Sequence, residues 1–159
     1  MQRRELLQNL LLGTAGLAFA GAPALAAEFE ITKTNAEWQK ILKPEVYKVL
    51  RLQDTEYPGT SPLLKEHRKG TFSCAGCDLA LFSSTTKFES GTGWPSFWQP
   101  INARAVGKYV DKSHGMVRTE CHCSRCGGHL GHIFEDGPKP TGLRYCINGL
   151  AMTFKPGAA

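Results

Sequence analysis

The sequence predicts a mainly β domain with short helices at its N-terminal edge. After residue 70, short segments with β-branched or aromatic residues alternate with glycine- and proline-rich turns, and there is no long helical period. Two Cys-x-x-Cys pairs in this region could join distant hairpins through one metal ion. With 159 residues, 42% of them hydrophobic, the chain is long enough for one domain with its own core.

The first 26 residues have the pattern of a twin-arginine signal peptide. Arg3 and Arg4 precede an apolar run that ends in a small-x-small cleavage site. We therefore expect a leader over 1–26, an exported domain over 27–159, a periplasmic or otherwise exported location, and no stable membrane insertion after cleavage. An uncleaved anchor is the alternative, and the Gly- and Ala-rich run broken by Pro23 disfavours it. Because twin-arginine export carries folded proteins, a metal loaded beforehand would protect the cysteine pairs from oxidation.

Two short helices are predicted next. Thr34 followed by Glu37 has the form of a capping box ahead of AEWQKIL, and Pro44 ends that helix. The same proline can occupy the first turn of a second helix in PEVYKVLRL. Residues 54–70 are polar and rich in turn residues, which indicates an ordered wrap around the domain.

The rest of the chain predicts strands. Gly and Pro separate them in GTGWP, CGGH and DGPKPTG, and their length and spacing are typical of an antiparallel arrangement. The expected strands are residues 70–74, 79–84, 87–90, 108–111, 115–121, 132–136, 144–148 and 151–154.

The charge pattern argues against a nucleic-acid partner. The formal net charge of +5 is modest, and lysines and arginines recur singly between acidic residues. No basic stripe suited to a phosphate backbone results.

The two Cys-x-x-Cys pairs predict a structural metal site. Cys74 and Cys77 form the first pair, and Cys123 and Cys126 form the second. Four thiolates satisfy Zn²⁺ completely and leave no open position for catalysis. Because residues 78–122 separate the pairs, the ion would join two distant hairpins instead of building a small zinc ribbon. Two disulfides, or one redox-active pair, are the alternatives.

The stretch TECHCSRCGGHLGH also holds residues that the zinc site does not use. Strand alternation turns His122 away from the face of Cys123, which predicts a surface residue. His129 and His132 lack the glutamate of a zincin helix, so a catalytic zinc on this pair is disfavoured. The two histidines are therefore free for acid–base chemistry or substrate binding, with ordinary surface or core imidazoles as the alternative.

Cys146 is the candidate nucleophile. It stands alone in GLRYCINGL, where Arg144 and Asn148, each two residues away, share its side of a strand. A cation favours thiolate over thiol, and an amide offers a hydrogen-bond donor. The alternative is a buried cysteine that acts as a small apolar residue.

Long segments of the chain resemble the methionine sulfoxide reductase B family. The resemblance lies in CAGCDLALFSSTTKFESGTGWPSFWQPI, in DKSHGMVRTECHCSRCGGHLGHIFEDGPKPTGLRYCING and in AMTF, with DTEYPG upstream, and it covers about residues 34 to 154. It implies two antiparallel sheets stapled by a four-cysteine zinc site. It also implies reduction of the R epimer of methionine sulfoxide in proteins, here the repair of oxidised exported proteins.

The same resemblance assigns roles to individual residues. Cys146 becomes the nucleophile, which attacks the sulfoxide sulfur and is left as a sulfenic acid. An external thiol, from a thioredoxin-like reductant, then restores it. The implied zinc ligands are Cys74, Cys77, Cys123 and Cys126, and the substrate pocket comprises His129, His132, Asn148, Trp94 and Arg144. For Trp94, the alternative is a core pair with Phe97 behind a glycine-rich turn.

Two positions depart from the family pattern. Thr92 stands where many members have a resolving cysteine, and Cys121 stands where the family usually has an aliphatic residue. Cys121 is either a substitute resolving cysteine or a core residue, and its place beside the zinc ligand Cys123 favours the core. A non-enzymatic zinc module with an inert Cys146 is the competing function, and the reactivity of that thiol distinguishes the two.

Overall fold

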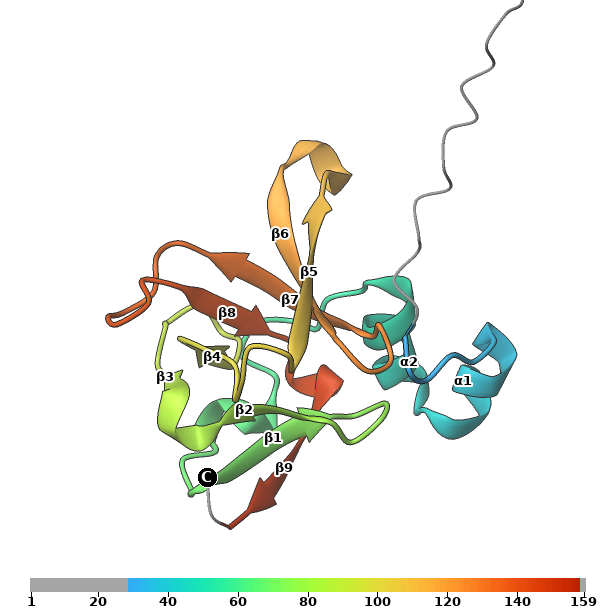
Figure 1. Cartoon of the computed structure of the whole chain (residues 1–159), viewed down its shortest axis with the longest axis horizontal. Helices are drawn as coiled ribbons and strands as arrows, with labels where there is room; N and C mark the ends of the chain where they lie inside the picture. Colours follow the sequence, from blue (N-terminus) through green and yellow to red (C-terminus); the bar gives the residue numbers. More distant parts are fainter. Residues whose placement is uncertain (1–28, 158–159) are drawn as a thin grey trace, which may run out of the picture.

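Two antiparallel sheets form the body of the protein (Figure 1). The computed structural model describes residues 29–157, so the predicted leader over 1–26 lies outside the described residues. The smaller sheet has the order β2-β1-β9, and the larger has the order β3-β4-β8-β7-β6-β5. The strands are β1 (Gly70–Cys74), β2 (Ala80–Ser83), β3 (Lys87–Phe88), β4 (Ser96–Phe97), β5 (Val106–Asp111), β6 (Arg118–Cys123), β7 (His129–Phe134), β8 (Arg144–Ile147) and β9 (Met152–Pro156).

An aromatic core joins the sheets. Phe72 of β1, Phe82 of β2 and Phe97 of β4 are fully buried, and the rings of Phe82 and Phe97 stack at 4.4 Å between centroids. Tyr145 of β8 packs edge-on against Phe82 at 5.8 Å. Burying large rings of this kind supplies much of the apolar stabilisation of a small domain. The predicted two-sheet fold is confirmed. Phe97 is a core residue, which was one of the two interpretations of its position.

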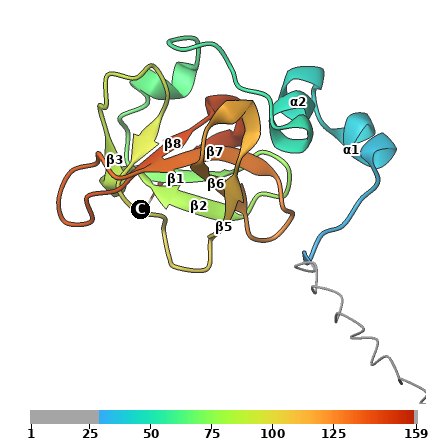
Figure 2. The same ribbon diagram turned by 90° about the horizontal axis from the view of Figure 1, so that it is seen from above.

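Two short helices flank the sheets at one end (Figures 1 and 2). Helix α1 (Asn35–Ile41) starts at the predicted capping box, since Thr34 accepts a bond from the Glu37 amide and the Glu37 carboxylate accepts one from the Thr34 amide. Helix α2 (Pro44–Leu52) has its proline in the first turn and packs against β7. Within residues 29–157, neither helix has the length and apolar character that crossing a membrane requires.

The observed strands differ from the predicted ones mainly at their ends. β6 begins at Arg118 rather than residue 115, because a short 3-10 turn, η3 (Ser113–Gly115), precedes it. β7 begins at His129 rather than residue 132, because Gly131 within it and the two glycines before it conceal the strand pattern. β4 was not predicted, because two residues are too few to show an alternating pattern. The other 3-10 turns are η1 (Pro62–Lys65), η2 (Ser84–Thr86) and η4 (Gly149–Ala151).

The register of the larger sheet sets four side chains in a row. Ser96 in β4 pairs with Cys146 in β8, which pairs with His132 in β7, which pairs with Glu120 in β6. Directly paired residues in antiparallel strands project from the same face. Strand pairing therefore brings together Cys146 and His132 from segments that the turn at 135–143 separates.

An irregularity in β7 brings the two histidines to the same face. Cys121 pairs with Gly131 while His122 pairs with His129, so Leu130 is an extra residue in β7. Residues three positions apart in a regular strand project from opposite faces of the sheet. One extra residue between them puts both side chains on the same face. The rings of His129 and His132 consequently meet edge to face, with 5.4 Å between their centroids.

Candidate active site and metal centre

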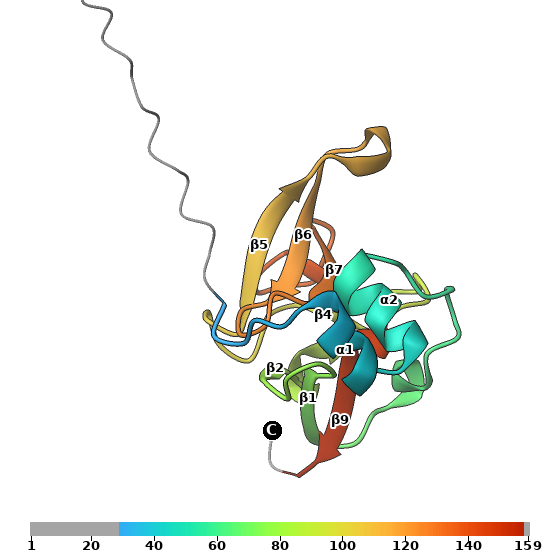
Figure 3. The same ribbon diagram turned by 90° about the vertical axis from the view of Figure 1, so that its right-hand side faces the viewer.

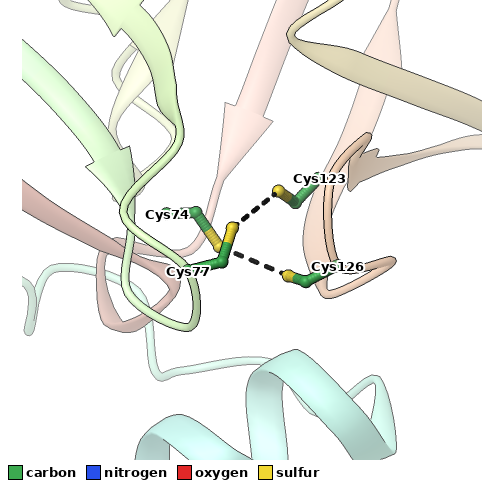
Figure 4. Close-up of side chains that lie close together, drawn as sticks. All are labelled: Cys74, Cys77, Cys123 and Cys126. Atoms are coloured by element: carbon green, nitrogen blue, oxygen red, sulfur yellow. Dashed lines mark hydrogen bonds between the residues drawn. The ribbon is translucent and has the colours of Figure 1, made fainter. Parts of the chain in front are cut away.

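The four predicted metal ligands form one cluster (Figure 4). Cys74 ends β1 and Cys77 lies in the turn after it, whereas Cys123 ends β6 and Cys126 lies in the turn before β7. The Sγ atoms of Cys74 and Cys126 are 3.8 Å apart, and those of Cys77 and Cys123 are 3.5 Å apart. The first pair is attached to a strand of the smaller sheet and the second pair to strands of the larger sheet, so an ion bound here would join the two sheets.

The geometry of the sulfurs fits one metal ion. All four Sγ atoms lie within 4.8 Å of one another. Four thiolates at about 2.3 Å from a tetrahedral ion are about 3.8 Å from each other. The contacts are far longer than the ~2.05 Å of a disulfide, and none of the six cysteines is in a disulfide. The cluster can bind a metal ion with all four positions filled.

Helices α1 and α2 lie side by side on one flank of the molecule (Figure 3), and both contact the turns that hold this cluster. Arg51 donates from Nη1 to the Cys126 carbonyl over 2.9 Å, and its guanidinium lies over the ring of Trp38. Trp38 and Leu50 are almost fully buried, and a side chain at Gly76 would contact both. Both predicted helices therefore pack against the turns that hold the four cysteines.

Cys146 opens into a separate pocket on the larger sheet. The pocket has a volume of about 140 Å³. Trp94, His132 and Asn148, which were predicted to contact substrate, line it together with Cys146. Four further residues complete the lining, namely Thr55, Arg118, Gly131 and Phe134. A small, partly apolar hollow with a thiol and an imidazole on its wall is suited to a methionine-sized side chain.

The thiol of Cys146 is protonated at rest. Burial raises its pKa above the ordinary value, and Arg144 and the Thr92 hydroxyl lower it without offsetting burial. Arg144 thus acts in the direction predicted for it. It also donates to both oxygens of Asp136 over 2.8 Å and lies over the ring of Phe134, which lines the pocket, but Arg144 itself is not among the lining residues.

His132 is held in one orientation by Asp111. Its Nε2 lies 2.8 Å from Asp111 Oδ2, and a carboxylate can only accept, so Nε2 carries the proton. Arg118 donates to the same oxygen over 2.7 Å. Burial lowers the pKa of His132, while the bond to Asp111 raises it. The imidazole is therefore neutral near neutral pH, and Nδ1 is its accepting nitrogen.

His129 lies behind the pocket wall. It is 3% exposed and is absent from the lining of the Cys146 pocket. Its Nδ1 donates to Glu120 Oε1 over 2.6 Å, and Nε2 has no hydrogen-bond partner within residues 29–157. The structure therefore places His129 against His132 rather than at the surface that a substrate would first meet.

Two side chains and two backbone amides around Cys146 converge on Glu56. Asn148 Oδ1 accepts from the Glu56 amide over 3.0 Å, and Trp94 Nε1 donates to the Glu56 carbonyl over 3.1 Å. The Glu56 carboxylate accepts from the amides of Gly149 and, over 3.1 Å, Leu150. Glu56 thus fixes the pocket wall and the turn that follows Cys146. Asn148 also donates to the Leu130 carbonyl, so most of its amide is engaged.

Glu56 had no predicted role. It lies in DTEYPG, a polar segment without periodicity, and only the resemblance of that segment hinted at importance. Burial raises the pKa of its carboxyl, against two accepted amide bonds that lower it. Because its pKa is higher in the folded state, this carboxyl stabilises the fold fully only at pH values below its ordinary pKa. That contribution is lost as the pH rises through the folded value.

Replacing Glu56 with glutamine is expected to loosen the site. A glutamine accepts through one oxygen only, so its NH₂ group would oppose one of the two buried amides. We expect a stability loss of about 1–3 kcal/mol and a fall in kcat larger than any rise in KM, because the pocket wall and Cys146 lose their alignment. Thermal unfolding and steady-state kinetics measure the two effects. Glu89→Gln at an exposed site is the control, and an unchanged kcat in Glu56→Gln would contradict the positioning role.

The prediction that His122 is a surface residue is wrong. The residue does face away from Cys123, as alternation required, but it is only 5% exposed. Its ring stacks on Tyr109 at 4.2 Å and meets the edge of Phe29 at 5.7 Å. A side chain at Gly107, its cross-strand partner, would collide with the ring. Phe29, which is distant in the sequence, packs on this face and buries it, and a local sequence pattern cannot show such a contact.

Cys121 lies in the core. It is 0% exposed, and burial raises the pKa of its thiol far above the ordinary value. It follows Glu120 directly in β6, and Glu120 is in the row that contains Cys146, so Cys121 projects from the opposite face of the sheet. This placement favours the core role over that of a resolving cysteine.

Comparisons with known proteins agree on one family. A family model described as SelR domain matches residues 42–156. The peptide methionine sulfoxide reductase MsrB of Leptospira interrogans is 55% identical over 127 residues, which is 80% of this chain and 97% of that protein. The protein of the same name from Agrobacterium fabrum is 53% identical over 80% of this chain and 94% of that protein. The one from Methanosarcina barkeri is 53% identical over 81% and 91%.

Proposed function

Since this chain belongs to the MsrB family of peptide methionine sulfoxide reductases and reduces methionine sulfoxide, we propose that it acts on the R epimer through a sulfenic acid at Cys146. The relatives favour this enzyme over the competing non-enzymatic zinc module. The observation that carries the proposal is the shared pocket, in which the thiol of Cys146, the imidazole of His132 and the indole of Trp94 meet.

The resting protonation states support a defined first step. Cys146 is a thiol and His132 is neutral with Nδ1 free to accept, so the thiol proton can pass to His132 as Cys146 attacks the sulfoxide sulfur. The resulting imidazolium donates that proton to the sulfoxide oxygen. Attack forms a bond between the cysteine sulfur and the substrate sulfur, and that bond breaks as the protonated oxygen moves from the substrate sulfur to the cysteine sulfur, which leaves an electron pair on the methionine sulfur. Methionine leaves, and the transferred oxygen and proton remain as Cys146 sulfenic acid, so that atoms and charge balance.

His132→Ala is expected to slow this step by ~10²-fold or more, the usual scale for a positioned acid or donor. Because the residue acts on the reacting oxygen, the loss should fall on the single-turnover rate of sulfoxide reduction. His67→Ala, at an exposed histidine that is not part of the pocket lining, serves as the control. A single-turnover rate of His132→Ala within threefold of the parent would remove His132 from the chemistry.

Stereospecificity follows from the placement of Trp94, His132 and Cys146 on different sides of the substrate sulfur. A sulfoxide sulfur carries a methyl group, an oxygen, the side-chain carbon and a lone pair, and the two epimers arrange these four groups as mirror images. Trp94 offers a flat apolar surface to the methyl group, and the bond from its Nε1 to the Glu56 carbonyl fixes the indole plane. His132 donates a hydrogen bond to the sulfoxide oxygen. Only one epimer satisfies both contacts while presenting its sulfur to Cys146.

The direct test is an assay with separated epimers of a peptidyl methionine sulfoxide, with dithiothreitol as reductant. We expect turnover of the R epimer and a kcat/KM for the S epimer lower by at least ~10²-fold, the scale of a lost positioned donor. Equal rates on both epimers would contradict the proposed specificity. Activity without a trappable sulfenic acid on Cys146 would contradict the proposed intermediate.

An external thiol is proposed to recycle the enzyme. Attack of that thiol on the sulfenic acid forms a mixed disulfide and releases water, and a second thiol equivalent frees Cys146. Thr92 next to Cys146 has no sulfur to offer, and Cys121 lies on the opposite face of the sheet. A thioredoxin-like protein is the proposed donor of both equivalents.

We propose zinc as the ion bound by the four cysteines. Four thiolates at these separations suit it, and the ion would be structural because no position remains for substrate. We also propose, on the twin-arginine pattern alone, that the protein works outside the cytoplasm on oxidised exported proteins.

A further inference from the structure

Three hydroxyl groups form a chain that ends at the sulfur of Cys146. Ser96 Oγ and Ser90 Oγ are 2.8 Å apart, and Ser90 Oγ and Thr92 Oγ1 are 2.9 Å apart. Thr92 Oγ1 is 4.0 Å from Cys146 Sγ. Ser96 is also the direct cross-strand partner of Cys146, where β4 lies beside β8 (Figure 1). The chain thus approaches the nucleophile from the strand next to its own.

The direction of each bond in this chain is determined from its far end. Ser96 Oγ lies 3.1 Å from the Trp94 carbonyl, which can only accept, so the single Ser96 hydrogen is used there. In the next bond Ser90 must then donate to Ser96. Its hydrogen is now used as well, so Thr92 must donate to Ser90. Thr92 therefore has only lone pairs left for Cys146, and the thiol donates its S–H to Thr92.

Ionisation of Cys146 requires the opposite direction. A thiolate has no hydrogen and accepts strongly, which favours donation from the Thr92 hydroxyl. If Thr92 turns to the sulfur, Ser90 can donate to Thr92 and Ser96 to Ser90. The Trp94 carbonyl then loses its donor. The chain has two consistent orientations, and the bond between Ser96 and the Trp94 carbonyl favours the one that suits the thiol.

We propose that Thr92, Ser90 and Ser96 form a reversible hydrogen-bond relay, in which Thr92 accepts from the Cys146 thiol at rest and donates to the thiolate during attack. The proposal rests on the proposed role of Cys146 as nucleophile, and Thr92 is a positioning residue in it. The relay gives a role to a threonine at the position where many family members have a cysteine. A hydroxyl there cannot form a disulfide, but it can stabilise the anion that attacks.

Other charged groups also act on Cys146 and stay constant in the test. Arg144 approaches from β8 and lowers the pKa of the thiol, whereas Asp136, bound to Arg144, opposes this. His132 faces it from β7, and Arg118 from β6 lines the same pocket. None of these four residues bonds to the three hydroxyls. Differences between hydroxyl variants therefore report the relay.

The test is the pH profile of Cys146 alkylation by iodoacetamide in the full, metal-loaded protein, followed by mass spectrometry of the Cys146 peptide. Thr92→Val keeps the shape but removes the donor, so alkylation at pH 8 should slow by about three- to tenfold and its midpoint should rise. Ser96→Ala removes the bond that holds the chain in its resting direction. Alkylation should then become faster by about two- to threefold, with a lower midpoint. Thr92→Ser should stay within twofold of the parent.

The opposite signs of the two variants separate a relay from loosened packing. Thr119→Val removes an exposed hydroxyl of β6 that lies outside the lining of the Cys146 pocket, and it should leave the alkylation profile unchanged. If Thr92→Val and Ser96→Ala shift the midpoint in the same direction, or neither shifts it, the relay is overturned. Ser90→Ala, outside any strand, gives the same sign test if Ser96→Ala does not fold. Alkylation does not depend on turnover, so failure of the epimer assay would reject the proposed function independently of this result.

Discussion

Cys146→Ser is expected to abolish methionine sulfoxide reduction, with a fall in kcat/KM of about 10⁴-fold or more, as when an essential nucleophile is removed. A serine hydroxyl remains protonated under conditions where a cysteine can ionise, and it is a poor nucleophile toward sulfur. Oxygen replaces sulfur at nearly the same position, so the pairing with His132 and Ser96 and the metal site should persist. Circular dichroism, metal analysis and an R-epimer assay measure these three properties on one sample.

Cys121→Ala provides the matched control for this variant. It removes a thiol from β6, which is separated from β8 by β7 in the same sheet, and from the opposite face, where Cys121 is fully buried. We expect normal recycling with an external thiol, at some cost in stability from the small cavity. Substantial turnover by Cys146→Ser would refute the assignment of the nucleophile. Loss of recycling in Cys121→Ala, with a Cys121–Cys146 disulfide formed in the parent, would replace the external-thiol route with an internal one.

Features with a local signature could be predicted from the sequence. The capping box at Thr34 specifies a helix start through residues three apart. The two Cys-x-x-Cys pairs gave the metal cluster, because each pair presents two sulfurs from one turn. The Gly- and Pro-rich turns delimited most strands. In each case the residues that form the sequence motif are also the residues that form the corresponding structural feature.

Features that depend on register between distant strands could not be predicted in this way. Asp111 reaches His132 only because β5, β6 and β7 pair in a particular register. The extra residue at Leu130, which puts both histidines on one face, leaves no mark in a glycine-rich segment. Glu56 joins the pocket wall to η4 over a sequence separation of more than 90 residues. His122 alternates as expected, yet Phe29 and Tyr109 cover it.

Cys123→Ala is expected to remove the bound metal and to destabilise the fold by more than about 3 kcal/mol. Metal binding contributes about 10–16 kcal/mol in small structural zinc sites, and that free energy is coupled to folding. A domain of this size has only about 5–15 kcal/mol of net stability, so losing one of four ligands consumes much of it. The loss acts at the junction of the sheets, because Cys123 ends β6 while its neighbour in the cluster, Cys77, follows β1.

Cys121→Ala distinguishes loss of the metal from loss of a buried thiol, since Cys121 and Cys123 lie on one strand and are both 0% exposed. Metal analysis should find one zinc per chain in the parent and in Cys121→Ala, and none in Cys123→Ala. Thermal unfolding should show a Tm lower by about 10 °C or more for Cys123→Ala, and chelation of the parent should approach the same value. Metal-free parent protein that keeps its Tm and its activity would refute the structural role, because the sheets would then hold together without the ion. Retention of the ion by Cys123→Ala would show instead that three cysteines suffice, and that Cys123 is a core residue beside the site.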